Sequence, residues 1–193
     1  MSMPPGPAVP NVAPNRKALV RVFNGLPQEI QRHFEHFPEL VQSQFPLEVC
    51  LAYLFSRVEL AHRDTLYCGV VKLHHANSEL ARAAIRRQHV TRDTFAELFH
   101  RLFEKPLPKA ISAKLQKAEK TRDKAMHGSE PKQAEMREAI VGTLDYARRY
   151  NKFVKSLAEF PPFGDLRGFH GRGKHLEKST TRLVLKGLGL SLR

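Results

Sequence analysis

The sequence predicts an all-α protein, built as an antiparallel bundle of four to six helices. Apolar residues recur at spacings of three and four along most of the chain, and proline or glycine separates these periodic segments. No alternating strand pattern of useful length occurs before residue 160. The 193 residues, 41% of them hydrophobic, suffice for one domain with a sizeable core. We expect a bundle over residues 16–160, between a leader at 1–15 and a basic tail at 161–193.

The leader contains five prolines and no charged side chain. It matches neither a secretion signal, which has a basic and then an apolar region, nor an arginine-rich transit peptide. We interpret it as a disordered, flexible segment. The longest apolar run, residues 49–55, is too short to cross a bilayer, so we expect no membrane association.

Three helical segments are predicted in the first half of the chain. Pro27 opens a short amphipathic segment that ends near Phe37. Residues 47–75 follow another proline and are apolar nearly all round, which is typical of a central, buried helix. Ser78 can cap a shorter helix that runs to residue 88.

Three further helical segments are predicted before residue 160. Thr91 or Asp93 can cap a helix with a stripe of phenylalanine and leucine. Two prolines then break the chain, and a helix over residues 107–126 is followed by a long one over about 132–160. The short link between these last two helices makes them antiparallel neighbours.

The cysteines and histidines show no metal-binding pattern. Cys50 and Cys68 lie in one apolar segment without CxxC spacing, so we expect small core side chains in a reducing, cytoplasmic interior. None of the ten histidines has a second ligand pair at the spacing of a zinc site. We expect no metal and no cofactor.

The charge balance favours a polyanionic partner, with nucleic acid first among them. The formal net charge is +13. Residues 107–126 carry six bases and two acids, and residues 164–193 carry seven bases and two acids. The alternative is a basic surface that is merely solvated.

The segment from Arg122 to Gly128, RDKAMHG, combines an arginine and a histidine just before a turn. Arg122 continues the apolar stripe of the 107–126 helix, as does Met126, so we expect its guanidinium to be covered and therefore paired or used. The alternative is a structural arginine that is ion-paired with an acid on a neighbouring helix. His127 lies in the last turn, and Gly128 suits the left-handed residue that ends a helix.

The spacing of this pair is weak evidence by itself. A chain with 18 arginines and 10 histidines contains about one Arg-x4-His by chance. A second copy, Arg57 and His62, lies in the middle of a helical segment with no glycine or turn after it. We interpret that copy as accidental.

The order of helices and the position of this motif resemble the HEPN superfamily over residues 26–160. The resemblance implies a helical bundle and a metal-independent endoribonuclease that works as a homodimer, with Arg122 and His127 as the catalytic pair. His127 can act as base or acid because histidine gains and loses protons readily in physiological solution, while Arg122 can stabilise charge on the phosphate. Asp123, where many members have asparagine, would orient this pair.

The resemblance also implies a role as a toxin or defence effector, restrained by an antitoxin or another regulatory protein. One subset of the family is silenced by adenylylation of a tyrosine two residues after the histidine. Ser129 occupies that position, so we do not expect this form of control.

The expected RNA-binding residues lie near the motif and in the tail. They are Lys120, Lys124, Arg167, Arg172 and Lys174. The tail mixes glycine, aromatic residues and arginine, as do flexible segments that follow a nucleic-acid backbone. It could equally be a linker that packs back through Phe163 and Phe169. Residues 179–193 could form a short basic helix, which Gly187 and Gly189 disfavour.

A second class of function is also consistent with the sequence. In this alternative the chain is a non-catalytic helical module that binds RNA, a nucleotide or a protein partner, and Arg122 serves the structure of the bundle.

Overall fold

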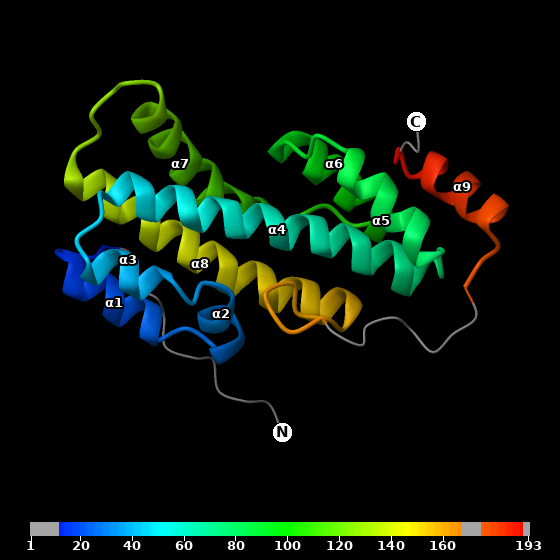
Figure 1. The fold of residues 1–193 in the computed structure, drawn as a ribbon, viewed down its shortest axis with the longest axis horizontal. Coiled ribbons are helices and arrows are strands. Elements are labelled where there is room, and N and C mark those ends of the chain that lie inside the picture. Colours follow the sequence, from blue (N-terminus) through cyan, green and yellow to red (C-terminus); the bar gives the residue numbers. More distant parts are fainter. Residues whose placement is uncertain (1–11, 167–174, 191–193) are drawn as a thin grey trace. The chain divides into compact units, whose positions relative to one another are not determined.

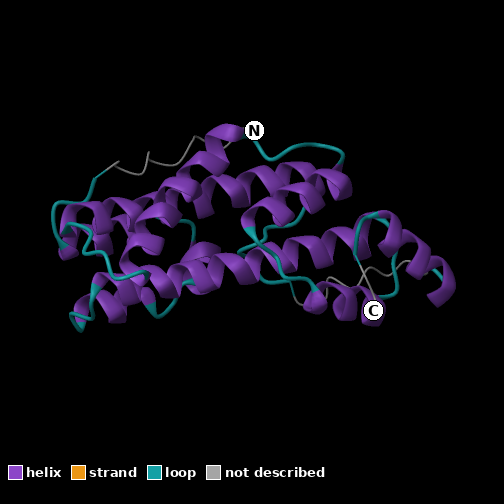
Figure 2. Ribbon diagram, turned by 90° about the horizontal axis from the view of Figure 1, so that it is seen from above, coloured by secondary structure: helices purple, strands orange, loops and turns teal. Residues whose placement is uncertain are grey.

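The computed structural model describes residues 12–166 and 175–190, and within these ranges the chain is entirely helix and loop (Figures 1 and 2). The predicted all-α class is therefore confirmed. The helices of the described ranges are α1 (Arg16–Asn24), α2 (Gln28–His33), α3 (Phe37–Gln42), α4 (Leu47–Leu73), α5 (Ser78–Arg87), α6 (Arg92–Phe103), α7 (Lys109–Met126), α8 (Gln133–Ala158) and α9 (Lys178–Gly187).

The predicted number of four to six helices is too low. The segment after Pro27 forms two short helices, α2 and α3, because the chain turns at residues 34–36 instead of continuing as one helix. Helix α1 was not predicted, and α9 forms within the expected tail. None of the described helices is both long and apolar enough to cross a membrane.

The chain divides into two compact units. Unit 1 comprises residues 1–57 and 109–150, and unit 2 comprises residues 58–108 and 151–193. Helices α4 and α8 each contribute residues to both units. The described residues of the expected tail, 161–166 and 175–190, fall within unit 2.

Unit 1 begins with a capped helix. The side chain of Asn15 accepts a hydrogen bond from the Ala18 N–H at 2.9 Å, which fixes the start of α1. Helix α1 packs against α3, and the rings of Phe23 and Phe37 lie 5.5 Å apart in this contact. The end of the expected leader is also attached here, since Arg137 Nε donates to the Ala13 carbonyl at 2.9 Å. Most of the leader lies outside the described residues.

Unit 2 contains residues 58–73 of α4, together with α5 and α6, each of which begins at a capping residue. Asn77, not the expected Ser78, caps α5, because its side chain accepts from the Leu80 N–H. Thr91 caps α6, as one of the two predicted candidates. Cys50 of unit 1 and Cys68 of unit 2 are both buried thiols, as expected.

The described part of the tail is anchored in unit 2. Phe163 is buried and its N–H donates to the Asn151 side chain at 3.0 Å. Helix α9 packs against α5, and the Thr181 hydroxyl accepts from the Asn77 N–H at 3.0 Å. The packing-back interpretation thus holds for Phe163, while Phe169 lies outside the described residues.

Candidate functional site

The motif stands at the end of α7, in unit 1. The His127 N–H donates to the Asp123 carbonyl at 3.0 Å, and the Ser129 N–H donates to the Lys124 carbonyl at 3.0 Å. Gly128 has a φ of +80°, as the sequence predicts for a glycine that ends a helix. This arrangement ends α7 at Met126 and places His127 at the edge of the turn, where it is exposed.

Arg122 is half-buried and has partners on two sides. Its guanidinium carbon lies 4.4 Å from the centre of the Phe55 ring of α4, in a cation–π contact. Its Nε and Nη2 atoms donate to one carboxylate oxygen of Asp123, at 3.0 and 2.7 Å. Glu119 lies at 3.8 Å. The structure therefore brings Arg122 and Asp123 together, and the acid partner is on the same helix instead of on a neighbouring one.

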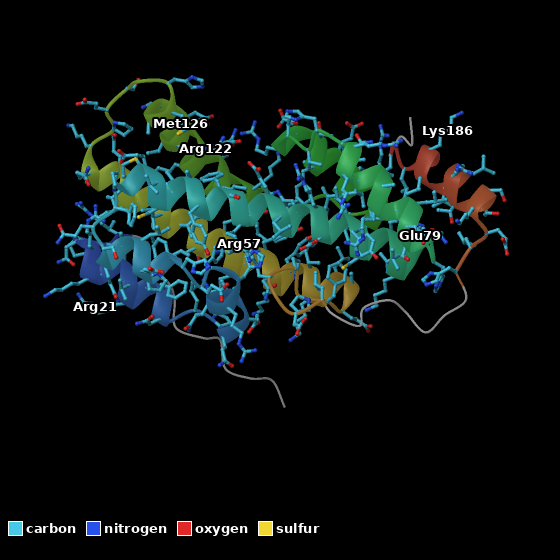
Figure 3. All side chains as sticks on the ribbon, viewed as in Figure 1. Arg21, Arg57, Glu79, Arg122, Met126 and Lys186 are labelled. Carbon is cyan, nitrogen blue, oxygen red and sulfur yellow. The ribbon has the colours of Figure 1, made fainter. Side chains whose placement is uncertain are left out.

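The apolar stripe of α7 does not continue to the end of the helix. Ile111, Leu115 and Ala118 are buried, and the side chain of Arg122 is 24% exposed. Met126, which we expected to face inward, is 66% exposed (Figure 3). The expectation for Met126 is wrong because the packing that covers α7 ends before its last turn, and this leaves the end of the motif open to solvent.

A groove runs between α7 and α8 within unit 1, beside the motif. Its volume is about 640 Å³. The side chains that line it are Lys114, Lys117, Ala118, Lys120, Thr121 and Lys124 from α7, with Glu135, Glu138, Ala139, Val141, Gly142 and Asp145 from α8. Lys120 and Lys124 were predicted as RNA-binding residues, whereas Lys114 and Lys117 were not. Lysines at 114, 117 and 124 recur at helical spacing, and this pattern could have indicated the shared face.

Asp145 forms the charged end of the groove. Its side chain is 6% exposed and is surrounded by Arg148 and Arg149, each at 2.8 Å, and by Lys114 at 3.7 Å. Burial by itself would raise the pKa of Asp145, but hydrogen bonds from the two arginines, and their charges, hold that pKa below its usual value. The carboxylate is therefore ionised and already matched by more than one cation.

The second Arg-x4-His copy has a different environment. Arg57 Nε donates to the His33 carbonyl at 2.8 Å in unit 1. His62, in unit 2, is buried and stacked on Phe95 with ring centres 3.9 Å apart. Burial lowers the pKa of His62 to about 3, so its ring is neutral at physiological pH. A buried, neutral histidine of this kind cannot reach a polymeric substrate, whereas His127 is exposed.

The remaining predicted residues, Arg167, Arg172 and Lys174, lie outside the described residues. Comparisons with family models, with curated proteins and with solved structures find no match to this chain.

Proposed function

We propose that this chain is a metal-independent endoribonuclease of the HEPN type, in which Arg122 and His127 act on the phosphodiester. The observation that supports the proposal is that a positioned guanidinium and an exposed imidazole lie five residues apart at one helix end. Phe55 and Asp123 hold Arg122 in place, and the turn at Gly128 leaves His127 open to solvent.

RNA can be cut without a metal because its 2′-hydroxyl is an internal nucleophile. A neutral histidine accepts the 2′-hydroxyl proton while the 2′-oxygen attacks phosphorus, and the bond from phosphorus to the 5′-oxygen breaks. A proton delivered to that leaving oxygen completes the step and leaves a 2′,3′-cyclic phosphate and a 5′-hydroxyl. Arg122 stabilises the charge that develops on the phosphate oxygens.

The two proton transfers support a dimer. One imidazole cannot easily reach both the attacking and the leaving oxygen, and a second copy of the chain would supply a second His127. Asp123 fits an orienting role, since it contacts Arg122 through two donor atoms. Light scattering should show a dimer at the enzyme concentration used for cleavage, and a monomer would contradict the shared site.

The deciding experiment is cleavage of mixed RNA in EDTA by wild-type protein, Arg122→Ala and His127→Ala. His100→Ala serves as the matched control, because it removes another exposed histidine, from α6. We expect cleavage by the wild type and by the control, 2′,3′-cyclic phosphate ends, and a loss of at least about a hundredfold in both motif variants. Intact RNA at high enzyme concentration, or cleavage that survives both motif substitutions, would refute the proposal.

A second candidate is favoured by the partners of Arg122. Asp123 and Glu119 oppose the charge of Arg122, and the Phe55 ring lies against its guanidinium, so in this candidate Arg122 serves the packing of unit 1 alone. The chain would then be a non-catalytic module that binds RNA. In the same experiment this candidate predicts salt-sensitive RNA binding without cleavage.

A further inference from the structure

The groove between α7 and α8 contains more charge than the motif uses. Four of its lining residues are lysines on α7 and three are acids on α8. Lys114 and Lys124 are ten residues apart, which corresponds to a rise of about 15 Å along the helix. The groove therefore presents a row of cations that ends next to the turn with His127.

The acids of the groove neutralise only part of this row. Glu138 pairs with Lys117, at 2.6 Å. Asp145 contacts Lys114 at 3.7 Å but is already matched by two arginines, so it does not cancel the lysine charge. Glu135 is engaged with the backbone, since it accepts from the Lys132 N–H at 3.1 Å.

Lys120 and Lys124 carry the uncompensated charge nearest the motif. Both side chains are exposed, and within the described ranges of the chain neither has an ion-pair partner. With Lys114 they form three positions along one helix at which a phosphate group would be attracted. A linear polyanion satisfies such a row better than a small molecule with one phosphate.

The shape of the groove selects among linear polyanions. It lies between two helices joined by the short turn from Met126 to Gln133, and packed helix axes are about 8–10 Å apart. An RNA double helix consists of two strands wound around paired bases, so it is too wide to enter this space. The lining residues include no aromatic side chain on which a base could stack.

We propose that the groove between α7 and α8 binds the phosphate backbone of single-stranded RNA and directs the strand to His127. Recognition is independent of base sequence, because the lining contacts are made by lysines and small residues. This inference rests on the proposed function, which it deepens by assigning the path that the strand takes between α7 and α8.

The first test measures binding of a fluorescent, 2′-O-methylated single-stranded RNA, which lacks the nucleophile and cannot be cut. Each phosphate contact adds about 0.7 to the slope of log affinity against log salt. We expect the slope of the double variant Lys120→Gln, Lys124→Gln to be shallower by about 1.4 than that of the wild type. Its loss of affinity relative to the wild type should therefore be about 25-fold greater at 0.1 M salt than at 1 M salt. The control, Lys152→Gln with Lys155→Gln, removes two exposed charges outside the groove and should keep the slope.

Two variants on α8 test the groove without removing a lysine. Glu138→Gln frees Lys117 from its ion pair and should tighten RNA binding severalfold. Gly142 lines the groove, and a Cβ there would lie 3.7 Å from the Lys114 carbonyl, an ordinary contact. Affinity should therefore fall in the order glycine, alanine, leucine at position 142. Both substitutions favour a helix, and an unchanged free energy of unfolding in urea would show that the loss of affinity comes from the filled groove.

The results separate this inference from the proposed function. Equal salt slopes for the two double variants, or tighter binding of duplex than of single-stranded RNA, would overturn the groove proposal even if Arg122 and His127 prove catalytic. Loss of binding in the groove variant, with no cleavage of unmodified RNA by wild-type protein, would support the groove and refute the ribonuclease. A weaker complex in Glu138→Gln would also count against the groove.

Discussion

Replacing Asp123 with asparagine tests whether this carboxylate competes with RNA for Arg122. In the free protein both donor atoms of the Arg122 contact point to one Asp123 oxygen. A phosphate that binds the same guanidinium must displace this oxygen or share the donors with it. Asparagine keeps an acceptor oxygen at the same place but removes the negative charge, so Arg122 should stay oriented while its attraction for phosphate increases.

The size of the effect follows from the repulsion between the Asp123 carboxylate and a phosphate bound to Arg122, which asparagine removes. Two unit charges about 6 Å apart repel by about 0.7 kcal/mol in water and by about 2.8 kcal/mol at an effective dielectric of about 20. The Asp123 side chain is 49% exposed, so the value lies near the water limit, and salt screens it further. We expect a gain of about 0.7 kcal/mol at low salt, which is about threefold in RNA affinity.

The assay is fluorescence anisotropy with 2′-O-methylated single-stranded RNA at two salt concentrations. Glu130→Gln is the matched control, because it removes one acid from the exposed turn that follows α7 and changes the net charge by the same amount. Asp123→Asn should bind more tightly than this control, and the difference should shrink at high salt. Equal affinities, or weaker binding by Asp123→Asn, would show that Asp123 does not oppose phosphate at Arg122.

Two further predictions concern stability. Gly128→Ala should lower the free energy of unfolding, measured by urea denaturation, by about 1 kcal/mol. The φ of Gly128 is +80°, and no atom lies within 4 Å of the added carbon, so the cost comes only from the backbone conformation. His62 has a pKa of about 3 when folded and 6.5 when unfolded, so below pH 6.5 the unfolded chain takes up a proton that the folded chain does not. The free energy of unfolding should therefore fall by up to about 1.4 kcal/mol per pH unit on acidification from pH 6 to 4, and His62→Phe, which keeps a ring on Phe95, should lose this part of the slope. An unchanged slope in the variant would contradict burial as the cause.

Helices that have a long periodic pattern and a local cap could be predicted from sequence. Helix α4 was expected over residues 47–75 and occupies Leu47–Leu73, and the end of α7 follows from Gly128. Helix α1 was missed because nine residues give too short a pattern. Such a helix depends on a cap and on packing, which α1 obtains from Asn15 and α3.

The partners of Arg122 could not be predicted from helical spacing. Adjacent residues on a helix do not face each other, so spacing indicates an ion pair with a neighbouring helix, and only the family resemblance gives Asp123 a role beside Arg122. The long arginine side chain instead folds back to Asp123. The groove was missed for a different reason, since its acids come from α8 and their alignment with the lysines of α7 is a property of tertiary packing.

The contact with Asp123 and the groove are linked by one energetic argument. Because the charge of Arg122 is already opposed in the free protein, a single phosphate gains little by replacing the Asp123 oxygen. A strand that is also held by Lys120 and Lys124 brings its phosphate to Arg122 without a further loss of translational freedom, so the exchange becomes favourable. The order of events is then groove first and motif second. The proposed function therefore assigns the chemistry to Arg122 and His127, and the proposed groove assigns the selection of the polymer to the lysines of α7.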